Sequence, residues 1–215
     1  MLLLPVGASL FIIGSYFVMI VIGAMGSTPT GDRVRMSFAT CPEAMPLIEA
    51  RVAAMGLGDP DTQQGADQLT ITATFPENPD VAASIPDTLS APGRFEIRPE
   101  GSTDVIVDNS HIVEVTLTLE RLGDPLTIIR LGQDGARRLR EHMEAEREGA
   151  IVVWIDDDLV VTRMNQPAVL EGLIDLRPHQ ATREADIATA AERRVRLGYP
   201  LPCPAAVTKV ETVTP

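Results

Sequence analysis

Residues 151–162 read IVVWIDDDLVVT, so two apolar runs flank three consecutive aspartates. Short runs of apolar and β-branched residues joined by turn-forming residues are typical of a β-hairpin. The sequence therefore predicts antiparallel strands over 151–155 and 159–162, with residues 156–158 as the turn. Three carboxylates also suggest a cation site, but this stretch lacks the spaced oxygen ligands and the turn glycine of a calcium loop. We interpret them as turn residues.

Alternation of apolar and polar residues predicts further strands on both sides of this hairpin. Residues 33–38 (RVRMSF), 69–75 (LTITATF) and 113–120 (VEVTLTLE) have an apolar side chain at every second position. A period of two is the signature of a half-buried β-strand. A shorter strand is predicted over 95–98 and a Val- and Thr-rich closing strand over 206–212, while residues 126–131 form a short apolar stretch.

Helical spacing of apolar residues predicts three helices. Thr40 and Glu43 have the spacing of a capping box, so the first helix is expected to begin there. A second helix is expected to stop at Gly149, and a third to start at Thr182. The Pro- and Asp-rich residues 76–92 are predicted to be mainly loop, with one weak helix at most. Because strands and helices mix without a regular βαβ repeat, the predicted fold class is α+β.

A charge-free apolar run begins at Leu2 and ends at Met25. As a helix it would be roughly 36 Å long, enough to cross a hydrocarbon core of about 30 Å. The run is longer than the ~7–15 apolar residues of a signal peptide, and no Lys or Arg precedes it. The small-x-small sequence at 24–26 keeps a cleaved signal peptide as the alternative. We expect a transmembrane anchor over 1–26, a linker over 27–32 and one soluble domain thereafter.

The soluble part carries the whole net charge of −12. An acidic domain repels phosphate backbones, so nucleic acid is not an expected partner. Arg33 and Arg35 follow the apolar run, and the positive-inside rule alone would place the domain in the cytoplasm. Asp32 and Glu43 lie nearby, however, and folded domains often translocate regardless of charge. The residues themselves leave the side of the membrane open.

No residue pattern of an enzyme is present. His111, His142 and His179 are the three histidines, and none has a second ligand at metal spacing. The sequence contains neither an H-E-x-x-H nor a G-x-S-x-G motif. Cys41 and Cys203 are too few for a structural zinc site and do not form a C-x-x-C pair. We therefore expect no enzymatic activity, no metal and no cofactor.

Three stretches, in order and spacing, resemble the first periplasmic region of the SecD family, which assists Sec-dependent protein export. They match the family's helix ending in an Arg-Val pair with its following strand, its central hairpin with the loop after it, and its helix ending in a Gly-x-Leu-Pro-x-Pro turn. In this sequence they are residues 48–57 with 65–75, residues 150–156 with 165–167 and Gly172, and residues 185–202. The resemblance runs from Arg33 to Pro215.

The sequence also departs from the family pattern. The Gly- and Asp-rich motif that follows the family's first membrane helix is missing from residues 26–32, and residues 173–179 replace the glycine-rich loop of the head. The sequence ends at Pro215, where the family enters the membrane helices that serve proton coupling. Such coupling needs an ionisable group within the membrane, and the run from Leu2 to Met25 has none. We expect no proton-motor activity.

The resemblance implies a layout of two subdomains on the periplasmic side of the bacterial inner membrane. A ferredoxin-like base would be built from both ends of the soluble part, 33–99 and 204–215, with a head inserted over 100–203. The first and last strands of the base would be antiparallel neighbours. Cys41 follows the first and Cys203 precedes the last, so the layout implies a disulfide between them. The alternative is two buried free thiols.

The function implied is that of a membrane-anchored accessory in protein export, which binds translocating polypeptide or the Sec translocon. Apolar grooves or exposed strand edges of the head would hold an extended chain by β-augmentation. The expected contact surface lies around the central hairpin and the loop after it: Trp154, Asp158, Met164, Asn165, Pro167, Val169 and Gly172. The alternative is a structural role, in which the domain scaffolds another envelope complex.

Overall fold

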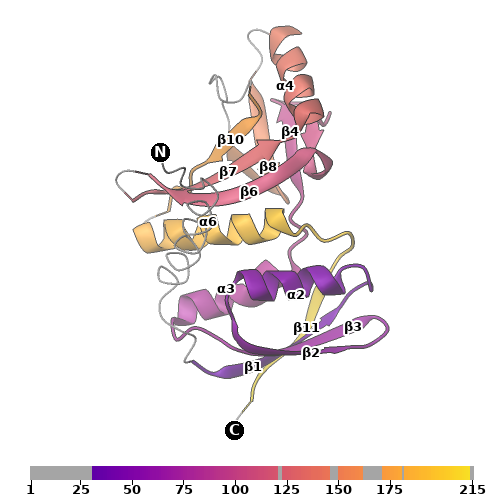
Figure 1. Cartoon of the computed structure of the whole chain (residues 1–215), viewed down its shortest axis with the longest axis vertical. Helices are drawn as coiled ribbons and strands as arrows, with labels where there is room; N and C mark the ends of the chain where they lie inside the picture. Colours follow the sequence, from indigo (N-terminus) through magenta and orange to yellow (C-terminus); the bar gives the residue numbers. More distant parts are fainter. Residues whose placement is uncertain (1–30, 121–122, 146–149, 162–170, 181, 214–215) are drawn as a thin grey trace, which may run out of the picture.

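The two ends of the described part of the chain meet in one sheet. The computed structural model describes residues 31–120, 123–145, 150–161, 171–180 and 182–213, which form two lobes with helix α6 between them (Figure 1). The apolar run from Leu2 to Met25 lies outside these residues. Among the residues that are described, no helix is both long and apolar enough to cross a membrane.

The lower lobe in Figure 1, called the base here, is an antiparallel sheet with two helices on one face. The sheet has four strands in the order β11-β1-β3-β2. Its elements are β1 (Arg33–Ala39), α2 (Met45–Ala54), β2 (Gly58–Gln64), β3 (Gln68–Thr74), α3 (Pro79–Ser90) and β11 (Ala206–Thr212). The apolar positions of the alternating strands, such as Met36 and Ile71, are fully buried under the helices.

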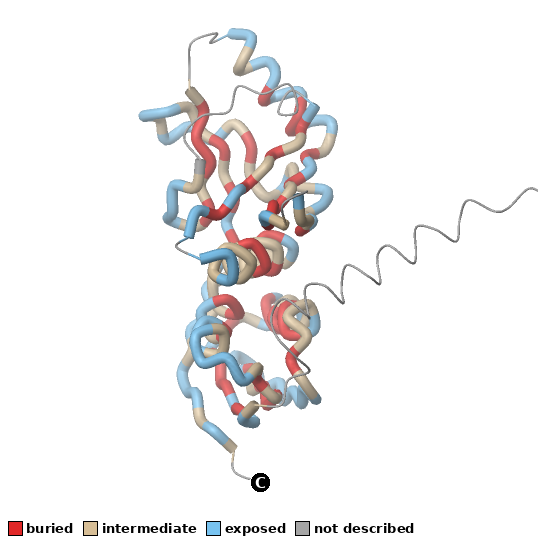
Figure 2. Tube along the Cα trace, turned by 90° about the vertical axis from the view of Figure 1, so that its left-hand side faces the viewer, coloured by how far each residue is buried: buried red, intermediate tan, exposed pale blue. Residues whose placement is uncertain are grey.

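The upper lobe, called the head, contains two antiparallel sheets. The strand orders are β5-β4-β8-β9 and β10-β7-β6. The strands are β4 (Phe95–Pro99), β5 (Val107–Asp108), β6 (Ile112–Leu119), β7 (Pro125–Leu131), β8 (Ile151–Ile155), β9 (Asp158–Val161) and β10 (Leu173–Leu176). The helices are η1 (Asn109–His111), α4 (Gln133–Ala145) and α6 (Arg183–Gly198). Figure 2 shows two separate groups of buried segments, one in each lobe.

Several predicted elements are confirmed because their signals are local. The hairpin turn falls at residues 156–157, and β9 begins at Asp158. Thr182 caps α6 by accepting a hydrogen bond from the backbone N–H of Ala185 at 3.2 Å. The closing strand covers the predicted residues 206–212 as β11. The α+β fold class is correct.

Other expectations are wrong. The capping box is absent, because α2 has Ala44 at its N-cap and Thr40 instead contacts Cys203 Sγ at 3.6 Å. Residues 76–92, expected to be mainly loop, contain the helix α3, which Asn78 caps. The strand Phe95–Pro99 was expected in the base but pairs with β5 and β8 of the head, because its apolar residues complete the head core.

A disulfide joins Cys41 to Cys203 in the base, across a sequence separation of 162 residues. Their Cα atoms are 6.4 Å apart, because β1 and β11 are antiparallel neighbours. The backbone N–H of Cys41 also donates a hydrogen bond to Cys203 Sγ at 3.3 Å. The bond ties the segment after β1 to the segment before β11, so it closes the loop that contains the head.

Candidate functional site: the cleft between head and base

The joint between the two lobes is built around one buried arginine. Arg51 of α2 is fully buried, and its guanidinium donates to six backbone carbonyls. Four acceptors lie at or just past the C-terminal end of α3 and two near that of α6: Thr88, Leu89, Ala91, Pro92, Arg196 and Tyr199. The last carbonyls of a helix have no partner within the helix and carry its partial negative charge. One side chain therefore caps two helices from different lobes.

Burial, and to a lesser degree the nearby Arg196, lowers the pKa of Arg51 to about 10. The guanidinium therefore remains charged at neutral pH. A buried charge is tolerated where its hydrogen bonds are satisfied, and here backbone carbonyls replace the more usual carboxylate partner.

The hairpin turn of the head closes the other side of this joint. Asp156 adopts a positive φ of 55°, and its Oδ1 accepts from the backbone N–H of Arg94 at 2.8 Å. Its Oδ2 lies 3.5 Å from Arg196 Nη1 of α6. The Asp residues that form the turn thus also fix the connection between α3 and β4.

Gly93 lies in the segment between α3 and β4, and substituting it tests how closely the two lobes approach each other. Its φ is +72°, and an added Cβ would lie 2.2 Å from the carbonyl oxygen of Arg196. Gly93→Ala is expected to cost on the order of 2–4 kcal/mol of unfolding free energy, from backbone strain together with this clash. Gly101→Ala is the control, because Gly101 has a φ of +76° but no atom within 4 Å of such a Cβ. Equal losses in urea unfolding of both variants would contradict the close contact at the joint.

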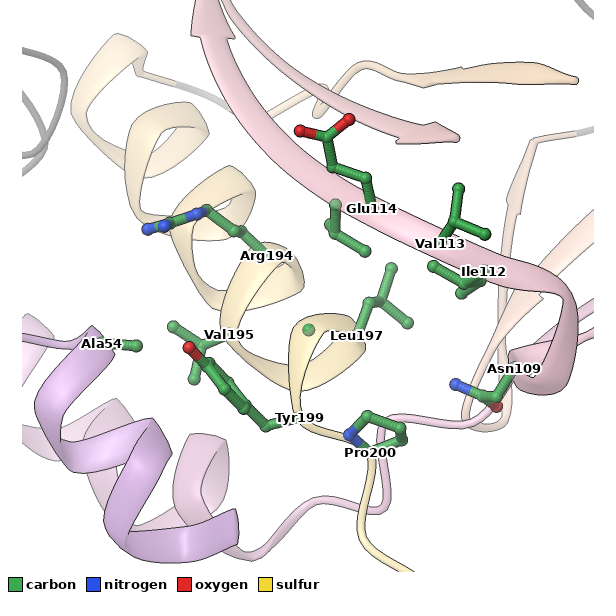
Figure 3. Close-up of a pocket in the computed structure, with 12 residues that line it drawn as sticks. Ala54, Asn109, Ile112, Val113, Glu114, Arg194, Val195, Leu197, Tyr199 and Pro200 are labelled. Atoms are coloured by element: carbon green, nitrogen blue, oxygen red, sulfur yellow. The ribbon is translucent and has the colours of Figure 1, made fainter. Parts of the chain in front are cut away.

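Beside this joint lies a cleft of about 310 Å³ between the head and the base. β6 and η1 form one wall, α6 the other, and Ala54 of α2 lies at the base side (Figure 3). Leu197 projects from α6 toward β6, which carries Ile112 and Val113 (Figure 3). Tyr199 and Pro200 close the lower end, and the Tyr199 hydroxyl is directed toward Ala54. The size is at the lower end of ligand-site volumes, and the lining combines apolar side chains with the polar Asn109, Glu114 and Arg194.

One wall of the cleft is a strand with an unpaired edge. Among the strands that the structure describes, β6 pairs with β7 alone, and the backbone N–H of Glu120 donates to the carbonyl of Asp124 at 2.9 Å. Since backbone groups alternate in direction along an antiparallel strand, those of Val115, Leu117 and Leu119 point away from β7. Val115 borders the cleft, and no described residue outside the β6–β7 pair forms a hydrogen bond with its outward-facing N–H and C=O.

The 3₁₀ turn η1 fixes the end of this wall. Asp108 Oδ1 accepts from the backbone N–H of Ser110 at 2.9 Å and from its hydroxyl at 2.5 Å. His111 Nδ1 lies 2.9 Å from the same oxygen, and His111 Nε2 lies 3.5 Å from Asp134 Oδ2 of α4. The turn places Asn109 in the lining of the cleft. Asn109 Oδ1 also accepts a hydrogen bond from the backbone N–H of Phe95 at 2.8 Å.

The hydrogen bonds of Asp108 in this turn can be tested by measuring how the stability of Asp108→Asn depends on pH. The Ser110 hydroxyl, and to a lesser degree His111, lowers the pKa of Asp108 below its ordinary 3.8. An acid whose pKa is lowered by folding stabilises the fold above its unfolded pKa and loses this contribution as the pH falls through the folded value. The free energy of unfolding of the variant is expected to be about 1 kcal/mol lower than that of the wild type at pH 7. This difference should shrink below pH 3.8. Asp104→Asn is the control, because Asp104 is exposed. If the stability lost in Asp108→Asn did not depend on pH, the stabilising role of the ionised Asp108 would be contradicted.

The residues expected from the sequence to form a contact surface are only partly described. Met164, Asn165, Pro167 and Val169 lie outside the described residues. Trp154 and Asp158 lie on β8 and β9, away from the cleft. Gly172 packs against α4, because a Cβ there would lie 2.8 Å from that of Ala136. The structure therefore does not bring the described members into the cleft.

The alternation of residues 113–120 predicted the cleft strand but gave no sign that its edge is unpaired. Nor could sequence spacing reveal Arg51, because its acceptors lie 37 to 148 residues away. Within the described residues, no group of His, Cys, Asp and Glu could hold a metal ion. The cleft is lined by apolar side chains together with Asn109, Glu114 and Arg194.

Comparison with known proteins places the fold. No protein-family model matches this chain, and no curated protein matches it in sequence. A solved structure described as SecDF in a super-membrane-facing form is similar at TM-score 0.65 and 13% identity, over 94% of this chain and 34% of its own. A second, of a membrane component SecDF that enhances protein export, has TM-score 0.64 and 14% identity over 83% of this chain and 100% of its own. This chain thus spans about a third of the first structure. At such low identities the likeness shows fold alone, and the fold is SecD-like.

Proposed function

We propose that this chain assists protein export by holding extended segments of translocating polypeptide in the cleft between head and base. The observation that carries the proposal is the edge of β6, which no other described strand covers, beside a cleft that is lined in part by apolar side chains. An added strand gains backbone hydrogen bonds from an edge whatever its sequence, and its alternate side chains enter the groove. Binding that depends little on sequence suits a protein that meets many unfolded chains.

The fold supports this role, since one of the similar SecDF structures is described as a membrane component that enhances protein export. The disulfide supports an extracytoplasmic location, because such bonds persist in oxidising compartments and are rare in the cytosol. We therefore propose that residues 1–26 anchor the chain in the inner membrane, with both lobes on the periplasmic side. The role assigned is binding, without catalysis or proton-motor activity.

Val115→Pro tests the proposal. The Val115 N–H points away from β7, so proline removes a donor from the free edge without breaking the β6–β7 ladder. The assay is photo-cross-linking of a labelled, permanently unfolded secretory polypeptide to the full chain in detergent, from a photoreactive residue at Val113, which is 64% exposed. We expect the yield of the cross-linked product to be at least about fivefold lower in Val115→Pro than in the wild type, because one or two hydrogen bonds are lost.

Val210→Pro in β11 is the matched control, since Val210 lies on a strand edge in the base. It should leave the cross-link unchanged. Equal cross-linking in wild type and Val115→Pro would contradict binding at the β6 edge.

A scaffolding role is the second candidate, and a different surface favours it. Trp154 of β8 and Leu159 of β9 are cross-strand neighbours, and Leu159 is 46% exposed. The guanidinium carbon of Arg98 lies 5.7 Å from the centroid of the Trp154 ring. Trp154 and Arg98 are half-buried beside the exposed Leu159, and Trp and Arg are enriched among the residues that contribute most to interfaces between folded proteins. This surface would suit a stable partner in an envelope complex.

A further inference from the structure

The base sheet has two edges, and they differ in how well they resist pairing. β2 (GDPDTQQ) carries Pro60 between two aspartates, and its register with β3 is irregular between Gly58 and Asp61. Proline, charge and irregularity are the features that block strand addition at an edge. β11 (AVTKVET) contains neither Pro nor Gly, its register shift with β1 lies before Lys209, and its Val210 is 50% exposed. Figure 2 shows this strand, leading to the C-terminus, largely exposed.

The direction of the backbone groups shows what this edge offers. The N–H of Val213 donates to the carbonyl of Arg33 at 2.7 Å, and Glu211 is paired with Arg35. Backbone groups alternate along an antiparallel strand, so the N–H and C=O of Val210 and Thr212 point away from β1. No described residue bonds to them.

The side chains of β11 divide by face. Val210 is opposite the buried Met36, on the face that the helices cover. Lys209 and Glu211 lie on the other face, where Lys209 Nζ is 2.6 Å from Glu211 Oε2. Arg35 Nη1 is 3.4 Å from Glu211 Oε1. The edge thus has an apolar residue flanked by a cation and an anion.

We propose that β11 pairs antiparallel with β11 of a second copy of this chain, with the two Val210 residues opposite each other. Two-fold symmetry then places Lys209 opposite Glu211 of the second copy, and the reverse. The two exposed Val210 side chains cover each other, and their backbone groups exchange two hydrogen bonds. The base sheets of the two copies join into one.

The charges select both this register and this partner. The alternative that pairs Val210 with Thr212 would set Glu211 against Glu211 of the second copy, and like charges directly opposite are destabilising. Any other strand would need an anion and a cation two residues apart in matching order. A second copy supplies both by symmetry, as in other isologous dimers.

Mixing two charge variants tests the pairing between copies. Lys209→Glu has two glutamates at the edge and Glu211→Lys has two lysines, so each alone should dimerise at least about tenfold more weakly than wild type. Mixed together they should form a heterodimer, because every pair between the copies is then opposite in charge. The Lys209–Glu211 pair within each chain is lost in both variants and is not restored by mixing. The readout is energy transfer between differently labelled full chains in detergent at about 0.15 M salt, where surface charges are screened beyond about 8 Å.

A single new cysteine tests the geometry. Both native cysteines are in the disulfide, so Val210→Cys adds the one free thiol and should give a covalent dimer on mild oxidation. Thr62→Cys on the β2 edge is the control and should remain monomeric. Val210→Pro should abolish dimerisation while keeping the β6 cross-link described above, which separates this inference from the proposed function. A wild-type chain that stays monomeric, or mixed variants that associate no better than each alone, would overturn the proposal.

Discussion

Replacing Arg51 by methionine is expected to lower the free energy of unfolding by about 3–5 kcal/mol, because several buried carbonyls lose their hydrogen-bond donor at once. The variant leaves carbonyls of α3 and α6 without a donor in a site that excludes water, because Arg51 is fully buried. An unsatisfied buried acceptor costs roughly 1–3 kcal/mol. For a domain of this size, the melting temperature should fall on the order of 10 °C.

Arg51→Lys separates charge from geometry. Lysine keeps the charge but has three donors on a flexible stem, and cannot span the carbonyls as a planar fork does. We expect a loss between those of the wild type and the methionine variant. Arg33→Met is the control, because Arg33 is exposed on β1. A methionine variant as stable as Arg33→Met would show that other contacts hold the joint.

Loss of the Cys41–Cys203 disulfide is expected to have an effect of similar size. The bond spans 162 residues, and a loop of this length contributes about 5 kcal/mol in the chain-entropy model. Reduction, or the double change Cys41→Ala with Cys203→Ala, should therefore lower the melting temperature by roughly 10–20 °C.

Calorimetry with and without reductant measures this effect. The wild type should lose stability on reduction, whereas the double variant should not respond. A wild type indifferent to reductant, with its thiols shown to be free, would mean that the bond does not constrain the unfolded chain.

Sequence patterns predicted those elements whose causes are local. The Asp-rich turn, the Thr182 cap and the alternating β1 and β3 depend on neighbouring residues or on one period of burial. β2 was not predicted, because it is an exposed edge strand held by pairing with β3 and has no buried side to leave an alternating pattern. In α3 the Asn78-Pro79 start was a usable signal, since Asn favours the N-cap and Pro the first helical position. This signal was overlooked because residues 76–92 are rich in Pro and Asp, a composition that is typical of loops.

The site was less predictable than the fold. A cleft between lobes is formed by segments distant in sequence, and here it joins Ala54, Val115 and Leu197. The role of Arg51 depends on two helix ends that meet only after folding. The motifs that resemble SecD indicated the fold correctly, and the contact surface that they imply lies at the central hairpin, away from the edge of β6 on which the proposed function rests.

In vivo photo-cross-linking compares the two candidate surfaces directly. Photoreactive residues at Val113, beside the cleft, and at Leu159, beside Trp154, would be followed by mass spectrometry of the adducts. Export assistance predicts that Val113 captures exported polypeptides or Sec components, and that Val115→Pro reduces this capture. Adducts from Leu159 to a single unrelated envelope protein, with none from Val113, would contradict export assistance and favour a scaffold.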